Sequence, residues 1–533
     1  MTAALNRLRD NTALIGVLVL AFAMRVMNLG YGLPYFYADE PVFVGPTIYM
    51  LSSLDPNPHW FGHPGHFLMY LLAGWFILVS LGVLAFRFLT GHIHGPADVS
   101  ALFSAETYRE VLRPVYYLSG RFLMVLLALL AILLTYRIGR KLFGKPAALL
   151  AGLTLAVSPM LVAGGRFIRT DIPGVVLIVL SQFFLLNFIE EKKNKWLIAA
   201  SLTAGFAIAD KYTLGLFMLL ILAYAVEDGL KRRKAAVNLL TVLAFTFIGF
   251  FVFAPFVLLD FKHAIADILL ETETTHLGAD RLPGLQNYYW YFKYGVYDAV
   301  GGAFFMAFAA VGLIPVCLKG DFKKRFFLVF PLVYFFVMAS ASIRFQNRLM
   351  PVLPFVAVLF GAGVHGTHRF ISGRIRPRAA ARAVLIVFWV LTFAALVSVA
   401  VRDYRYAETF SRTDSRTIAK EWIESHLPAG SKIAYEDYAP QMQVNPKRPF
   451  VLLDRGYDKI VSLPLSAYEE QSVDYIIITD SFRSRFFEEP KKYGLEIQRY
   501  KELVKKTELV KVFSYPDHPG PVIRIYRLKG TTG

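Results

Sequence analysis

The feature that most constrains this chain is a series of apolar runs, most of them long enough to cross the ~30 Å hydrocarbon layer of a bilayer. Hydrophobic residues make up 56% of the 533 residues and charged residues 18%, which excludes a string of ordinary soluble domains. The pattern predicts a polytopic α-helical membrane protein. About eleven spanning helices are expected, at residues 12–29, 117–136, 147–165, 172–189, 196–209, 212–227, 235–258, 296–318, 326–343, 350–367 and 383–402.

Basic residues fall in clusters between these predicted spans. If the N-terminus is cytoplasmic, the clusters come to the cytoplasmic side one after another, as the positive-inside rule requires. They are Arg7 and Arg9; Arg137, Arg140, Lys141 and Lys145; Lys192, Lys193 and Lys195; residues 231–234; Lys319, Lys323, Lys324 and Arg325; and Arg369, Arg374, Arg376, Arg378 and Arg382. Topology therefore accounts for most of the net charge of +18, and nucleic-acid binding is disfavoured. We expect a multi-pass protein of the cell (plasma) membrane.

One apolar segment conflicts with this topology. Residues 67–86 are apolar enough to span, but a span there would invert everything downstream and move the cluster from Arg137 to Lys145 outside. We therefore assign this segment to an interfacial or re-entrant helix in the first outer loop, residues 30–116.

The C-terminal part changes character after the last predicted span. Charged residues become frequent, residues 415–427 have an amphipathic helical pattern with Ser415 as N-cap, and residues 432–436 and 473–479 have strand patterns. The sequence thus predicts a transmembrane domain over 1–402 and a soluble extracytoplasmic α/β domain over 403–533. The single Cys317 excludes an internal disulfide.

Carboxylates near the outer membrane surface are the first candidates for chemistry. Asp39 and Glu40 follow the first span, and Asp171 follows the third together with Arg166 and Arg169. The alternative for both places is helix capping, since Asp39 precedes Pro41 and Asp171 stands at the start of the next span. Two acids from different outer loops can nevertheless converge at one membrane surface, and this favours a catalytic site.

Basic residues on the outer side are exceptions to the topology rule. Lys211, Arg344 and Arg348 all lie at or outside the outer boundary. Ammonium and guanidinium groups bind phosphate through charge-assisted hydrogen bonds, so these three predict a phosphate site. The alternatives are a structural ion pair, such as Lys211 with Asp210, or snorkelling to lipid headgroups.

Histidines and acids of the outer loops are further candidates for substrate binding. His59, His63 and His66 are spaced closely, but Pro64 and Gly65 break a regular helical face, which disfavours a metal site. The segment 271–284, with Glu271 and His276, has the composition of a loop that meets a substrate. A divalent cation, Mg²⁺ or Mn²⁺, bound between Asp39 and Asp171 is an open alternative.

Taken together, these motifs resemble those of the C-type (GT-C) membrane glycosyltransferases, close to the protein O-mannosyltransferases and the aminoarabinose transferases of lipid A modification. The carriers are residues 38–43 (ADEPVF), 57–65 (NPHWFGHPG), 136–144 (YRIGRKLFG), 158–173 (SPMLVAGGRFIRTDIP), 206–215 (FAIADKYTLG) and 343–354 (IRFQNRLMPVLP). The resemblance implies that Asp39 is the catalytic carboxylate, that Asp171 is the acid of the second outer loop, and that the anomeric carbon is inverted. Where aminoarabinose transferases carry a donor-site lysine, this chain has Gly62-His63-Pro64-Gly65, so His63 is at most a substitute.

The expected function is transfer of a sugar, hexosyl or pentosyl, from a polyprenyl monophosphate donor to a lipid, glycan or protein acceptor at the outer face. In this hypothesis Asp39 is the general base, Glu40 and Asp171 orient the acceptor or tune the base, and Lys211, Arg344 and Arg348 hold the leaving phosphate. His63, Arg169, Glu271 and His276 are expected to contact substrate. The alternative is a transporter or flippase for lipid-linked sugars, which predicts inverted repeats that the sequence does not show.

Overall fold

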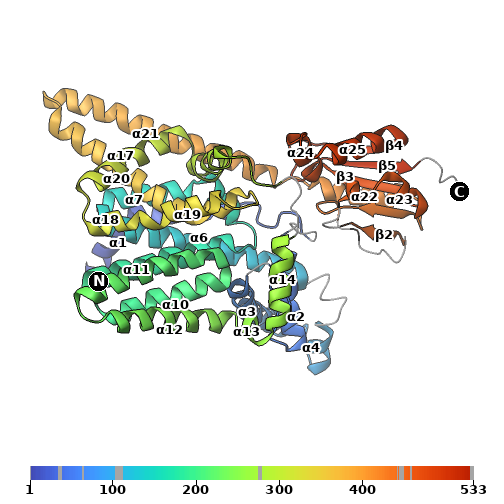
Figure 1. Ribbon diagram of the computed structural model, residues 1–533, viewed down its shortest axis with the longest axis horizontal. Coiled ribbons are helices and arrows are strands. Elements are labelled where there is room, and N and C mark those ends of the chain that lie inside the picture. The colour runs from blue at the N-terminus through green and yellow to red at the C-terminus, as the bar shows by residue number, and fades with distance from the viewer. Residues whose placement is uncertain are drawn as a thin grey trace. The chain divides into compact units, whose positions relative to one another are not determined.

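The structure is a computed structural model that describes residues 2–33, 39–62, 65–102, 112–273, 279–440, 442, 449–455 and 459–528 (Figure 1). It divides into two compact units. Unit 1 comprises Met1–Leu29, Asp39–Thr274 and Leu282–Tyr404, and unit 2 comprises Gly30–Ala38, Thr275–Arg281 and Arg405–Gly533.

Unit 1 is a helical bundle. Its first helices are α1 (Thr2–Val26), α2 (Pro41–Ser53), α3 (His66–Leu89), α4 (Pro96–Leu102), α6 (Arg113–Phe143), α7 (Lys145–Ala156), α8 (Pro159–Gly164), α9 (Asp171–Glu191), α10 (Asn194–Asp210), η2 (Tyr212–Gly215), α11 (Leu216–Lys231), α12 (Ala235–Phe253), α13 (Phe256–Leu259) and α14 (Phe261–Glu273). The others are α15 (Leu285–Trp290), η3 (Tyr291–Tyr297), α16 (Asp298–Val300), α17 (Ala303–Lys319), α18 (Phe322–Phe327), α19 (Val329–Ala339), η4 (Gln346–Val352), α20 (Leu353–Arg374) and α21 (Arg378–Thr409).

Several of these helices can cross a bilayer. Within the described residues, seven are long and apolar enough, or eight if the bent pair at 285–300 and 303–319 forms one span. The polytopic helical fold class predicted from the sequence is thereby confirmed. Several predicted spans are broken rather than continuous. The one at 147–165 breaks ahead of Pro159, which cannot continue a helix, and the one at 296–318 bends by 98°.

The bend has a local cause in two glycines. Gly301 and Gly302 have φ angles of 119° and 98°. Side chains rarely tolerate this region because the Cβ atom collides with the backbone, so the glycine pair permits a turn that a continuous helix excludes. The consequence is that α17 leaves the turn in a new direction, where it packs against α20.

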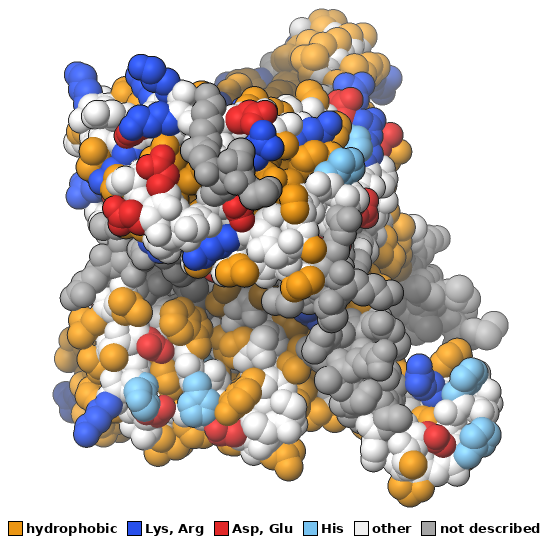
Figure 2. Space-filling model, turned by 90° about the vertical axis from the view of Figure 1, so that its right-hand side faces the viewer, with side chains coloured by type: hydrophobic (Ala, Val, Ile, Leu, Met, Phe, Trp, Pro, Cys, Tyr) orange, Lys and Arg blue, Asp and Glu red, His pale blue; other side chains and the backbone are white. Residues whose placement is uncertain are grey.

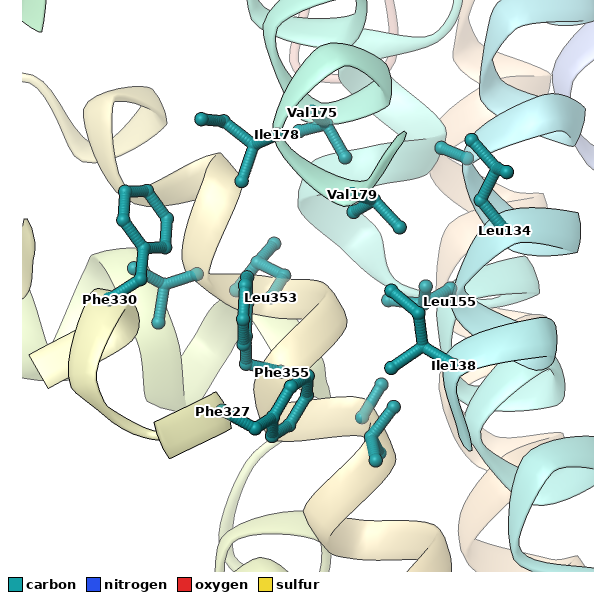
Figure 3. Packing of buried hydrophobic residues seen from close by; sticks show 14 of the residues in the cluster. Leu134, Ile138, Leu155, Val175, Ile178, Val179, Phe327, Phe330, Leu353 and Phe355 are labelled. Atoms are coloured by element: carbon teal, nitrogen blue, oxygen red, sulfur yellow. The ribbon is translucent and has the colours of Figure 1, made fainter. Parts of the chain in front are cut away.

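The bundle is held together by a continuous apolar core between helices that are distant in sequence. Figure 3 shows Leu134 and Ile138 of α6 facing Leu155 of α7, with Val175 and Val179 of α9 beside them. Phenylalanines 327, 330 and 355 extend the same core toward α18, α19 and α20. Burying side chains of this size excludes lipid and solvent from the centre and fixes the helices relative to each other.

Two glycines allow α10 and α12 to approach closely, and Figure 1 shows these helices running side by side. A Cβ atom on Gly205 would lie 2.2 Å from the carbonyl oxygen of Thr246, and one on Gly249 would lie 2.3 Å from that of Leu202. Any side chain at either position would therefore force the backbones apart, as in other small-residue contacts between membrane helices.

Helix α3 contains residues 67–86, the apolar segment that conflicts with the predicted topology. Phe67 packs against Phe206 and Phe253, close to the C-terminal ends of α10 and α12, with ring centroids 6.1 and 4.7 Å away. Two turns later, the indole of Trp75 donates to the carbonyl of Ser119, in the second turn of α6 (3.0 Å). Because α3 meets its neighbours at their end turns, it lies across these ends.

This arrangement is the one expected of an interfacial helix. The second half of α3 carries an exposed apolar face, including Ile77, Leu78, Leu81 and Phe86. By length and composition alone, α3 also qualifies as a span. Its place relative to the bilayer, and with it the orientation of the chain, stays a prediction.

Unit 2 is an α/β fold. Its elements are α22 (Ser415–His426), β1 (Lys432–Tyr435), β2 (Val451–Asp454), η5 (Ile460–Ser462), α23 (Leu465–Glu470), β3 (Tyr475–Thr479), α24 (Asp480–Glu488), α25 (Gly494–Lys506), β4 (Thr507–Phe513) and β5 (Ile523–Leu528). The strand order is β2-β1-β3-β5-β4, in which β1 is parallel to β2 and β3, and β5 is antiparallel to β3 and β4. Charged side chains of both signs are interspersed on the face that Figure 2 shows.

Both faces of the central strand β3 are covered, which explains its continuous apolar sequence. Ile477 packs on one face with Ile423 of α22, and Ile476 packs on the other with Phe486 of α24. Helix α22 begins as predicted, but its N-cap is Asp414 and not Ser415. The Asp414 carboxylate accepts from the backbone N–H of Arg416, whereas the Ser415 hydroxyl donates to the carbonyl of Pro521.

Candidate functional site

Glu40 anchors the start of α2 inside unit 1. Its carboxylate is fully buried and accepts two hydrogen bonds from the Arg121 guanidinium, at 2.8 and 2.6 Å, and one from the backbone N–H of Ile168. Arg121 also donates to the carbonyl of Leu29. Although Glu40 is the N-cap residue of α2, its side chain makes no hydrogen bond to that helix, so the capping alternative does not describe it.

This burial corrects one prediction. The sequence predicts that Glu40 orients the acceptor or tunes the base, but a side chain with 0% exposure, bonded through both oxygens, is not available to a substrate. Its geometry suits a positioning residue, which ties the loop that carries Asp39 to α6 and to the segment before α9. Arg121 was not singled out from the sequence, although a charge inside a predicted span is itself a signal.

Asp171 is the point where three segments of the chain meet. It is the first residue of α9 and is buried, with 3% of its side chain exposed. Lys211 donates to one carboxylate oxygen (3.0 Å) and the Asn347 amide donates to the other (2.9 Å). The N-cap of α9 is Thr170, so Asp171 serves these contacts rather than capping.

Arg169 connects the two aspartates. Its guanidinium lies 3.2 Å from a carboxylate oxygen of Asp39 and 3.5 Å from one of Asp171. The structure thus brings together Asp39, Arg169, Asp171 and Lys211, four residues that the sequence predicted for one site. Asp39 differs from Asp171 in having 37% of its side chain exposed, which leaves its carboxylate accessible to a ligand.

The segment after α19 carries the other predicted phosphate ligands. The hydroxyl of Tyr291 donates to the carbonyl of Ile343 and accepts from the backbone N–H of Phe345, which fixes this segment. The guanidinium of Arg344 lies over the Trp290 ring (5.2 Å), and Arg348 donates to the same Ile343 carbonyl (2.9 Å). In the sequence the two arginines stand on either side of Asn347, whose amide donates to the Asp171 carboxylate.

Asp210 is the residue with which Lys211 would form a structural ion pair if Lys211 had no part in the site. The Asp210 carboxylate is fully buried, and among the described residues neither of its oxygens has a hydrogen-bond partner. Lys211 turns instead to Asp171. A local pair between these two neighbours is therefore not the reason for the placement of Lys211.

Three predicted substrate residues cannot be placed. His63 and His276 lie outside the described residues, and the side chain of Glu271, near the end of α14, is also outside them. Among the residues that are described, the site also contains Asn347, which no sequence pattern indicates although it stands between Arg344 and Arg348.

The residues do not fit a metal between Asp39 and Asp171. A guanidinium cation, that of Arg169, already contacts both carboxylates. Among the described residues, no group of three or more histidine, cysteine, aspartate and glutamate side chains has the geometry to hold an ion. Oxygen-ligand cations need more donors than this pair provides.

Comparison with known proteins agrees with this architecture. Residues 114–258 match the family model of the dolichyl-phosphate-mannose-protein mannosyltransferases. A search of curated protein sequences gave no significant match.

Solved structures resemble the chain over nearly its whole length. ArnT from Cupriavidus metallidurans, bound to undecaprenyl phosphate, has a TM-score of 0.50 and 15% identity, with 98% of both chains covered. The Archaeoglobus fulgidus oligosaccharyltransferase tethered to an acceptor peptide has a TM-score of 0.51 and 13% identity, with 97% of this chain and 74% of that chain covered. At such identities the likeness establishes the fold. The chain therefore has the multi-pass GT-C fold of these glycosyltransferases, and residues 114–258 carry the family-model match.

Proposed function

We propose that the chain transfers a glycosyl group from a polyprenyl monophosphate to an acceptor at the outer membrane face, with inversion at the anomeric carbon. The observation that carries this proposal is the convergence of Asp39, Arg169, Asp171, Lys211 and Asn347 from separate segments. Similar structures support a lipid-linked donor, since ArnT was solved with undecaprenyl phosphate and the Archaeoglobus fulgidus oligosaccharyltransferase AglB with a dolichol phosphate.

Asp39 is the general base in this proposal. Of the two converging aspartates it is the exposed one, and its neighbour Glu40 is fixed by the buried pair with Arg121. Asp39 takes the proton of the acceptor hydroxyl or amine while the acceptor atom bonds to C1 of the sugar. At the same time the C1–O bond breaks and its electron pair goes to the phosphate oxygen. General-base help of this kind contributes roughly 10² to 10⁴-fold.

Lys211, Arg344 and Arg348 hold the leaving phosphate. Lys211 directly precedes the short segment η2, and its side chain, which is 19% exposed, contacts the Asp171 carboxylate. The two arginines lie in a segment that hydrogen bonds to Tyr291 hold in place. A positive charge at this position stabilises the transition state, because negative charge grows on the departing phosphate oxygen as the bond breaks. Asp171 then orients Lys211 and Arg169. We propose this role for Asp171 in place of a direct contact with the acceptor.

The proposal names the donor and the acceptor by chemical class. The donor is a polyprenyl monophosphate hexose or pentose, and the acceptor is a lipid, glycan or protein nucleophile. Arg169, which joins the aspartates, is placed to meet either substrate, and His63, Glu271 and His276 keep their proposed contacts with substrate.

The deciding experiment separates base catalysis from transport. Asp39→Asn keeps the size of the side chain but removes the base, so purified variant in nanodiscs should lose transfer to acceptor by at least roughly 10²-fold. Binding of polyprenyl phosphate, a product without sugar, should be unchanged, because Asp39 does not hold the phosphate. Asp171→Asn should leave more residual transfer. Near-normal transfer by Asp39→Asn would contradict the assignment, and lipid-linked sugar crossing the bilayer without any transfer would favour the flippase.

A further inference from the structure

A polar cavity lies at the far end of α6 and α9, the helices that carry Arg121 and Asp171. It has a volume of about 820 Å³ and is formed by α1, α6 and α9. Its polar lining includes Tyr136, Arg137, Arg140 and Lys141 of α6 and Asn187 of α9. Asn187 is sixteen residues after Asp171 on one helix, a rise of about 24 Å, so the cavity is well separated from the candidate active site.

The α6 wall gathers positive charge on one side of the helix. Residues 136, 137, 140 and 141 follow the i, i+4 spacing that places side chains on adjacent turns of one face. Lys141 is neutralised by Glu190 (2.6 Å). Arg137 and Arg140 are exposed, and within the described part of the chain neither forms an ion pair. The wall therefore offers two uncompensated guanidinium groups.

The same wall contains an unused hydrogen-bonding group. Tyr136 is 2% exposed, and its hydroxyl has no hydrogen-bond partner among the described residues. A buried hydroxyl without a partner costs free energy, so a ligand oxygen at this position would be stabilised. Two guanidinium groups and a hydroxyl are the donors that recognise a phosphate.

Apart from Asn11 of α1, the rest of the lining is apolar. It consists of Leu14 and Ile15 of α1, Leu133 of α6 and Phe183 of α9, and 44% of Ile15 is exposed. In a membrane protein an exposed isoleucine of this kind faces lipid. A small anion would gain nothing from the apolar lining, whereas a phosphate joined to an acyl chain would use both the basic and the apolar parts.

We propose that this cavity binds an anionic glycerophospholipid of the leaflet opposite the active site. Its phosphate lies against Arg137 and Arg140 and accepts from the Tyr136 hydroxyl, and one acyl chain lies along Leu14, Ile15 and Phe183. The basic cluster that the sequence analysis assigned to topology thus has a specific ligand. The proposal does not depend on the proposed glycosyl transfer.

The test uses the full-length protein in detergent and measures lipid binding by native mass spectrometry. Phosphatidylglycerol is the probe, with phosphatidylcholine and inorganic phosphate as comparisons. Arg137→Gln with Arg140→Gln should weaken phosphatidylglycerol binding by roughly tenfold or more, because each basic residue near an anionic lipid contributes appreciably. Tyr136→Phe should weaken it severalfold while leaving the charge unchanged, and it serves if the double variant does not fold.

A matched control removes two charges elsewhere. Arg233 and Lys234, in the turn between α11 and α12, are exposed and do not line the cavity. Arg233→Gln with Lys234→Gln should change phosphatidylglycerol binding by less than about twofold, since ordinary surface charge gives no site. Equal losses in both double variants would overturn the proposal. So would equal binding of phosphatidylcholine, or displacement of the lipid by inorganic phosphate at equal concentration.

Discussion

At the scale of single residues, Glu40 and Asp39 show how neighbours in sequence acquire different tasks. Glu40 points inward to the buried Arg121, and Asp39, partly exposed, reaches Arg169. Replacing Glu40 with Gln leaves the Arg121 charge buried without its partner, which costs about 3 to 5 kcal/mol. We therefore expect Glu40→Gln to lower the thermal midpoint of the protein in detergent and to reduce transfer per folded molecule.

The matched control is the adjacent carboxylate. Asp39→Asn should leave the thermal midpoint within a few degrees of the original, because a partly exposed ion pair contributes about 1 kcal/mol or less. If both variants had the same midpoint, Glu40 would not be the anchor of the loop.

Glu436 gives unit 2 a dependence on pH. Its carboxyl group follows β1, is fully buried, and accepts from the backbone N–H of Thr479 (3.0 Å). Burial raises the pKa of Glu436 from 4.5 to about 7. The folded unit thus holds a proton that the unfolded chain releases, so the contribution of Glu436 to stability is fully present below about pH 4.5 and is lost, by roughly 3 kcal/mol, as pH rises through 7.

Hydrogen exchange of the full-length protein measures this effect. The strand β3, residues 475–479, should exchange faster at pH 8 than at pH 5 after correction for the intrinsic exchange rate. In Glu436→Gln the corrected rate should lose this pH dependence. Retention of the same slope by the variant would assign it to another group.

At the scale of elements, the contact between α10 and α12 depends on two glycines. Gly205→Ala places a Cβ atom 2.2 Å from the Thr246 carbonyl oxygen, so the two helices must separate. Overpacking of this kind costs about 1 to 3 kcal/mol, and we expect a lower thermal midpoint. Gly16→Ala in α1 is the control, because a Cβ atom there meets nothing within 4 Å and alanine favours helix by about 1 kcal/mol. An unchanged midpoint for Gly205→Ala would mean that the contact is loose.

At the scale of the whole molecule, the outstanding expectation is orientation. The basic clusters place the N-terminus in the cytoplasm and unit 2 outside, provided that α3 lies along the membrane surface. A phosphatase reporter fused after Gly533 should therefore be active, and a reporter that works only in the cytoplasm should be silent. The opposite pattern would mean that α3 spans the bilayer.

The amino-acid sequence alone predicts the membrane class, the approximate helix positions, the α/β character of the C-terminal part and most members of the candidate site. Each of these depends on local properties: apolar length, periodicity and the presence of charges at predicted membrane boundaries. Asp39, Asp171 and Lys211 could be predicted because a charge near hydrocarbon is costly and therefore conspicuous.

What each polar group faces could not be predicted from local sequence patterns. That Glu40 is buried against Arg121, that Asn347 reaches Asp171, and that Lys211 turns from Asp210 to Asp171 all depend on contacts between distant segments. The same holds for the bend at Gly301 and for α3 lying across helix ends. Local patterns set the ends and faces of helices, but the partner of a buried charge is chosen by packing, which brings segments from different loops to one point.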